Sequence, residues 1–88
     1  MGVYSLSFKP SVEKDLRILP SAASRLILKK IEQIPANPIS SKSVKLAGSD
    51  NFYRVRAGDY RIVYSVDHRT REVIIHYVRH RRDVYRSL

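Results

Sequence analysis

Two segments in which apolar and charged residues alternate lie on either side of Gly58-Asp59. From Asn51 to Ser65 the sequence reads NFYRVRAGDYRIVYS, with arginines between large apolar residues. This alternation predicts two antiparallel strands, because successive side chains of a strand point to opposite faces. A Gly-Asp pair between two such segments is a typical two-residue hairpin turn. We therefore predict a hairpin with Gly58 and Asp59 at its tip.

The predicted turn determines the face on which each hairpin side chain lies. Residues paired across the hairpin share a face, as do residues two apart along one strand. Arg56 then pairs with Arg61 and Arg54 pairs with Val63, so the three arginines lie on one face. The opposite face carries four residues suited to a hydrophobic core: Tyr53, Val55, Ile62 and Tyr64.

Two helical patterns precede the hairpin and follow a short alternating segment, Val3 to Phe8. Pro10 suits the first turn of a helix, and Pro20 ends this helix because proline disfavours helical geometry in the residue before it. Ser21 is positioned to cap a second helix. The apolar stripe of that helix recurs at helical spacing: Ala23, Ile27, Ile31 and Ile34.

The remaining segments complete an α+β pattern. Val44–Leu46 can begin extended structure, and Glu72–Val78 is apolar at nearly every position, as expected for a central strand covered on both faces. The tail Arg79–Leu88 can form a short helical turn. The order β-α-α-β-β-β predicts one domain over residues 1–88, with a small antiparallel-rich sheet and an N-terminal helical hairpin packed on one face. The arginines of the hairpin then lie on the opposite face.

Basic residues are in large excess and are unevenly distributed. The 88 residues include 17 Lys and Arg against 8 Asp and Glu, which gives a formal net charge of +9. Nine of the 11 arginines lie from Arg54 to Arg86, whereas all six lysines lie at or before Lys45. A small domain this basic usually binds a polyanion such as nucleic acid. The second half of the chain is therefore the predicted phosphate-binding half.

The composition also excludes several classes of protein and site. No run of about 18 apolar residues is present, so we expect no membrane span and no membrane partner. No secretory signal pattern occurs at the N-terminus. The absence of cysteine excludes disulfides and thiolate metal sites, and the three histidines lack metal-ligand spacing. We therefore expect a cytoplasmic protein without a metal or other cofactor.

Three arginines on one small face suit an anionic ligand. Their charges repel one another unless an anion binds between them. The planar guanidinium group grips phosphate oxygens with two parallel hydrogen bonds and stays charged at neutral pH. The alternative interpretation is a solvated sheet face whose arginines only keep the protein soluble.

The chain resembles the RelE/ParE superfamily of toxins from toxin–antitoxin pairs. The resemblance rests on FYRVRAGDYRIVYSVD, on HRRDVYR near the end and on the β-α-α-β-β-β order, and it extends over almost the whole chain. Members of the RelE branch cut messenger RNA on the ribosome, whereas the ParE branch poisons DNA gyrase. In both branches an antitoxin holds the toxin inactive. The resemblance thus implies an antitoxin partner with an acidic or amphipathic helix, a toxin–antitoxin hetero-oligomer, and the ribosome and its messenger RNA as further partners.

The RelE resemblance implies cleavage without a metal. A 2′-hydroxyl attacks the adjacent phosphodiester and leaves a 2′,3′-cyclic phosphate and a 5′-hydroxyl. This reaction needs a base, positive charge for the pentavalent phosphorane and an acid for the leaving oxygen. Arg61 matches the arginine of the family hairpin and is expected to stabilise that charge. Arg54 and Arg56 stand where RelE carries lysines, and because arginine does not act as a base, we expect them to bind phosphate.

The end of the chain supplies the other expected site residues. Tyr85 matches the family tyrosine that stacks on a base of the message. Arg81 matches a family arginine suited to protonating or stabilising the leaving group. Arg82 beside it could take the same role. His80 is assigned as acid or base, because histidine is the side chain best suited to proton transfer near neutral pH. Because only cleavage needs this set, it favours a ribosome-dependent endoribonuclease over the alternative, a ParE-like toxin that inhibits gyrase by protein binding.

Overall fold

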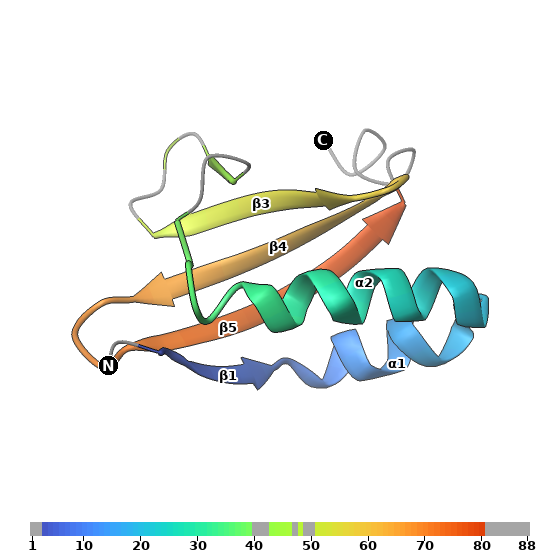
Figure 1. Ribbon diagram of the computed structural model, residues 1–88, viewed down its shortest axis with the longest axis horizontal. Helices are drawn as coiled ribbons and strands as arrows, with labels where there is room; N and C mark the ends of the chain where they lie inside the picture. Colours follow the sequence, from blue (N-terminus) through green and yellow to red (C-terminus); the bar gives the residue numbers. More distant parts are fainter. Residues whose placement is uncertain (1–2, 40–42, 47, 49–50, 81–88) are drawn as a thin grey trace.

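A computed structural model describes residues 3–39, 43–46, 48 and 51–80 (Figure 1). The described residues form one five-stranded sheet, in the order β1-β5-β4-β3-β2, and two helices. β1 pairs with β5 in parallel, and every other pair is antiparallel. The elements are β1 (Ser5–Phe8), α1 (Pro10–Ile18), α2 (Ser21–Gln33), β2 (Val44–Lys45), β3 (Phe52–Ala57), β4 (Tyr60–Asp67) and β5 (Glu72–His80). The α+β class, the antiparallel-rich sheet and the helical hairpin are confirmed.

The hydrophobic core lies between one face of the sheet and the two helices. α2 contacts β3 and β4, and α1 continues from the end of β1 along β5 (Figure 1). Alternation in the strands and helical spacing in α2 bring their apolar residues together, and burying an isoleucine contributes about 1.5–3 kcal/mol. The most deeply buried core residues include Val12, Ile27, Ile31, Ile62, Tyr64, Val66, Val73 and Ile75. The other face of the sheet has no helix of the described chain against it.

The β3–β4 hairpin has the predicted register. Arg56 pairs with Arg61, and Arg54 pairs with Val63. Gly58 begins the turn with a φ of 62°, in the left-handed region that glycine adopts without steric cost. A Cβ atom added at Gly58 would also lie 3.0 Å from the Leu26 side chain of α2. The backbone conformation and the close approach of α2 both favour glycine at this position.

Some predicted details are wrong. Ser21 is the first residue of α2 rather than its cap. Pro20 occupies the N-cap position, and no side-chain hydrogen bond caps the helix there. β5 continues to His80, two residues beyond the predicted end, so this part of the expected C-terminal helical turn is strand. β5 is an interior strand, but the two helices of the described chain cover only one of its faces, and Tyr77 on the other face is 37% exposed.

The remainder of the expected C-terminal turn, residues 81–88, lies outside the described residues. Neither helix of the described chain is long and apolar enough to cross a membrane.

Candidate functional site

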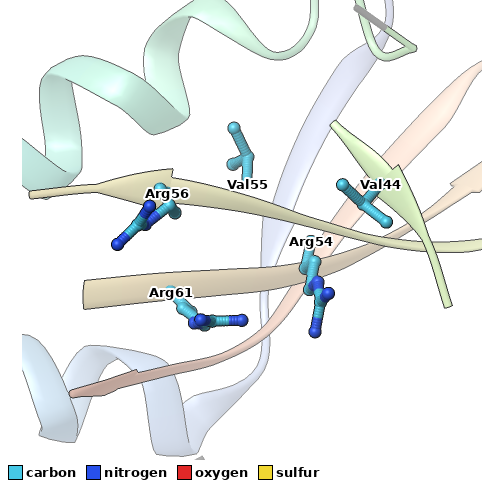
Figure 2. Close-up of a pocket in the computed structure, with 5 residues that line it drawn as sticks. All are labelled: Val44, Arg54, Val55, Arg56 and Arg61. Atoms are coloured by element: carbon cyan, nitrogen blue, oxygen red, sulfur yellow. The ribbon is translucent and has the colours of Figure 1, made fainter. Parts of the chain in front are cut away.

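Three arginines meet on the sheet face opposite the helices, which we call the arginine face. Arg54 and Arg56 project from β3, and Arg61 projects from β4 (Figure 2). They line a hollow of about 220 Å³ together with Val44 and Val55. Figure 2 shows the three guanidinium groups on the same side of the two strands, with the Val55 side chain on the other. The structure therefore brings together the three arginines that the hairpin pattern predicted.

The arrangement concentrates positive charge in a partly enclosed position. Arg56 is exposed, whereas Arg54 and Arg61 are half-buried. Arg56 and Arg61 are directly opposite each other across the two strands, where like charges are destabilising. A phosphate bound between them would relieve this repulsion and accept hydrogen bonds from more than one guanidinium group. The chemistry of the hollow thus suits a phosphodiester.

A fourth arginine, Arg79, is paired with this cluster through the strand register, but its guanidinium binds a carboxylate of α1; it was not assigned from the sequence. Arg79 of β5 pairs with Arg61 of β4, so the two residues share a face. Its Nη1 atom donates to Asp15 Oδ2 of α1 at 2.6 Å and to the Val78 carbonyl at 3.0 Å. A longer strand alone would not have revealed this pairing, because a regular β5 would place Arg79 opposite Tyr60, and an irregularity in the β4–β5 register moves it opposite Arg61.

His80 lies apart from the three arginines. It pairs with Tyr60, and their rings meet edge to face with centroids 5.3 Å apart. Because Tyr60 precedes Arg61 in the strand, Tyr60 and His80 lie on the face of the sheet that packs against the helices. His80 there lines a second hollow of about 270 Å³ with Asp15 and Leu19. Its role as acid or base remains a prediction.

The other predicted residues, Arg81, Arg82 and Tyr85, lie outside the described residues, and their roles also remain predictions. Within the described part of the chain, no three His, Asp or Glu side chains are grouped so that they could hold a metal ion.

Aromatic side chains occupy the end of the arginine face away from the hairpin turn. The Phe52 and His76 rings are 4.7 Å apart between centroids, and Ser65 Oγ lies 2.8 Å from His76 Nε2. Burial, together with the positive charge of Lys9, lowers the pKa of His76 below its ordinary value of 6.5. Lowering the pKa favours the neutral imidazole. Tyr77 follows on the same strand, with the Arg79 guanidinium 5.1 Å from its ring centroid.

Comparisons with known proteins agree with this fold. A family model described as the ParE toxin of the type II toxin–antitoxin system parDE matches residues 6–85. A Methanocaldococcus jannaschii protein that bears the toxin name RelE1 is 32% identical over 87 residues, which cover 96% of this chain and 97% of that protein.

Solved structures show the same similarity. A chain in the crystal structure of the archaeal RelE–RelB complex from Pyrococcus horikoshii is 30% identical, with a TM-score of 0.80 over 90% of this chain and 96% of that one. The isolated RelE toxin of E. coli is 26% identical, with a TM-score of 0.77 over 97% and 99% of the two chains. The resemblance found in the sequence is confirmed. This chain belongs to the RelE/ParE superfamily of toxins from type II toxin–antitoxin systems.

Proposed function

We propose that this toxin is an endoribonuclease that cuts translated messenger RNA on the ribosome. The observation that carries the proposal is the cluster of Arg54, Arg56 and Arg61 around one hollow on the sheet face opposite the helices. RNA offers a regular series of phosphates, and binding of a basic surface to it is driven by the release of counterions. The net charge of +9 supports association with a site walled by ribosomal RNA.

The proposed reaction needs no metal ion. The 2′-oxygen of one nucleotide forms a bond to the adjacent phosphorus as the bond to the 5′-oxygen breaks, which leaves a 2′,3′-cyclic phosphate and a 5′-hydroxyl. Arg61 stabilises the extra negative charge of the phosphorane, because a fixed cation in a partly enclosed site is worth more than one in water. Arg54 and Arg56 hold the flanking phosphates.

The proton transfers are assigned to the end of the chain. His80 is proposed as acid or base, and Arg81, or Arg82 beside it, is proposed to stabilise the leaving oxygen. Tyr85 is proposed to stack on a base of the message and so to align the 2′-oxygen with the phosphorus. Arg79 pairs with Arg61 across β4 and β5. It is a further candidate for stabilising the leaving oxygen.

We also propose an antitoxin partner that forms a hetero-oligomer with this chain. The similarity to RelE from a RelE–RelB complex supports it. An acidic or amphipathic helix would neutralise the arginine face, since opposite charges guide and orient such complexes. The ribosome and its messenger RNA are the other proposed partners, and the cytoplasm is the proposed location.

A ParE-like function is the second candidate, because the matching family model is described as a ParE toxin. In that case the chain would bind DNA gyrase and would not cut RNA. The arginine face favours cleavage, because protein binding alone does not require several cations around one hollow.

Mapping the 5′ ends of messenger RNA after brief expression of the toxin tests the two candidates. With the wild-type protein we expect new ends inside translated codons. With Arg61→Ala these ends should be lost, while Arg25→Ala, an exposed substitution on α2, should retain them. Growth arrest with intact messages and supercoiling-defective DNA would contradict the proposal and support gyrase inhibition.

A further inference from the structure

We propose that Phe52, His76 and Tyr77 form a stacking site for one base of the single-stranded RNA whose phosphates occupy the arginine face. We call these three residues the aromatic platform. The inference rests on the proposed function, because it assigns a position to a nucleotide next to the phosphate-binding arginines. It adds a binding site for the base itself, within the described part of the chain.

A β-bulge places two consecutive rings on the same face of the sheet. In β5, Tyr77 pairs with Val63 and Ile75 pairs with Tyr64, so His76 is an extra residue in the ladder. In a regular strand His76 and Tyr77 would point to opposite faces. A bulge re-aims side chains, and bulges are common near functional sites. Here the contact between His76 and Ser65 places the imidazole on the arginine face together with Tyr77.

The platform is held in place by the residues beneath and beside it. Val63, which pairs with Tyr77, and Ser65, which contacts His76, are only 5% and 7% exposed. Ser65 is hydrogen-bonded to His76, and Phe52 packs against the imidazole at a tilt of 42°. Tyr77 is the most exposed ring, at 37%. Aromatic rings fixed in this way bind a base at little cost in side-chain entropy.

The platform lies within reach of the phosphate-binding arginines. Arg54, Val63 and Tyr77 form one row across β3, β4 and β5. Adjacent strands are about 4.8 Å apart, so Arg54 and Tyr77 are separated by about 10 Å across the sheet. Arg79, which pairs with Arg61, has its guanidinium 5.1 Å from the Tyr77 ring centroid. A nucleotide can thus place its base on the platform while its phosphate contacts an arginine.

Single-stranded RNA fits this surface better than a protein segment does. A groove of positive charge combined with exposed rings is the usual design for binding single strands, because every base has a stacking face. An acidic antitoxin would complement the arginines, but it would not need stacking rings two strands away from Arg54. Binding through base stacking also predicts little sequence preference at this position.

The test compares two uncleavable ligands by fluorescence anisotropy at low salt. One is a short 2′-O-methyl oligoadenylate, and the other has the same length and charge but lacks the bases. The wild-type protein should bind the oligoadenylate about tenfold more tightly than the abasic strand. Tyr77→Leu keeps an apolar side chain at this half-exposed position but should reduce that ratio to nearly one. Tyr77→Phe retains the ring and should retain the ratio.

Two further measurements separate this inference from the proposed function. Arg61→Ala should weaken binding of both strands by the same factor, since it removes a phosphate contact and no ring. If Tyr77→Leu keeps the wild-type ratio while Arg61→Ala still weakens both ligands, the stacking site is refuted and the arginine face stands. If Tyr77→Leu instead weakens only the binding of an acidic antitoxin peptide, the platform is a protein contact and the inference is overturned. If the wild-type protein binds the two strands equally, the stacking site is also refuted, whereas the proposed function is tested separately by the mapping of messenger RNA ends.

Discussion

Replacing Arg61 by glutamine should make RNA binding less sensitive to salt, because it removes one phosphate contact. Each phosphate contact with a single strand contributes about −0.7 to the slope of log affinity against log salt concentration. Contacts from Arg54, Arg56 and Arg61 therefore predict a slope of about −2.1, or an affinity loss of about 20-fold between about 50 and 200 mM salt. With Arg61→Gln the slope should be about −1.4, and the loss about sevenfold. Arginines outside the described residues add equally to both slopes, so the difference of about 0.7 is the measured quantity.

The assay is a salt titration of the anisotropy of an uncleavable RNA strand. Arg25→Gln removes the same charge from the exposed surface of α2, away from the arginine face, and should leave the slope unchanged. If Arg25→Gln and Arg61→Gln lower the slope equally, RNA responds to the overall charge of the protein. The assignment of phosphate contacts to the arginine face would then be wrong.

Three further substitutions test other parts of the account. Asp15→Asn removes the carboxylate that holds Arg79 and should tighten RNA binding several-fold in the same anisotropy assay, whereas Glu13→Gln, an equal change of charge on α1, should not. Ile62→Ala removes a fully buried side chain and should lower the free energy of unfolding by about 2–5 kcal/mol, measured by urea denaturation. Because burial keeps the pKa of His76 below 6.5, the unfolded chain takes up more protons there, so stability should fall as the pH drops below 6.5. His76→Gln should reduce this acid-side loss in thermal melts.

The parts of the fold that sequence reasoning predicted well depend on local patterns. Gly58-Asp59 sets the hairpin register, because a two-residue loop allows one pairing, and that register places Arg54, Arg56 and Arg61 together. The spacing of Ile27, Ile31 and Ile34 similarly identifies the buried side of α2. Such signals are contained within a few residues and need no knowledge of the rest of the chain.

The missed features depend on contacts between distant segments. The bulge at His76 follows from the pairing of β5 with β4, and no alternation in the sequence marks an extra residue in the ladder. The face occupied by His80 is likewise set by its pairing with Tyr60. Arg79 was missed for the same reason, because without the bulge it would pair with Tyr60 on the helix-covered face rather than with Arg61. Its ion pair with Asp15 arises because β1 pairs in parallel with β5, which places α1 beside the end of that strand.

The most direct test of the central claim uses ribosomes programmed with a defined message and the purified toxin. We expect a cut within the codon being read, with a 2′,3′-cyclic phosphate on the upstream fragment. A single 2′-deoxy substitution at the nucleotide before the cut should abolish cleavage, because it removes the attacking oxygen. Arg61→Ala should reduce the cleavage rate by at least about a hundredfold, as the loss of a transition-state charge contact does elsewhere. Undiminished cleavage of the 2′-deoxy message, or an Arg61→Ala variant as active as the wild type, would contradict the account.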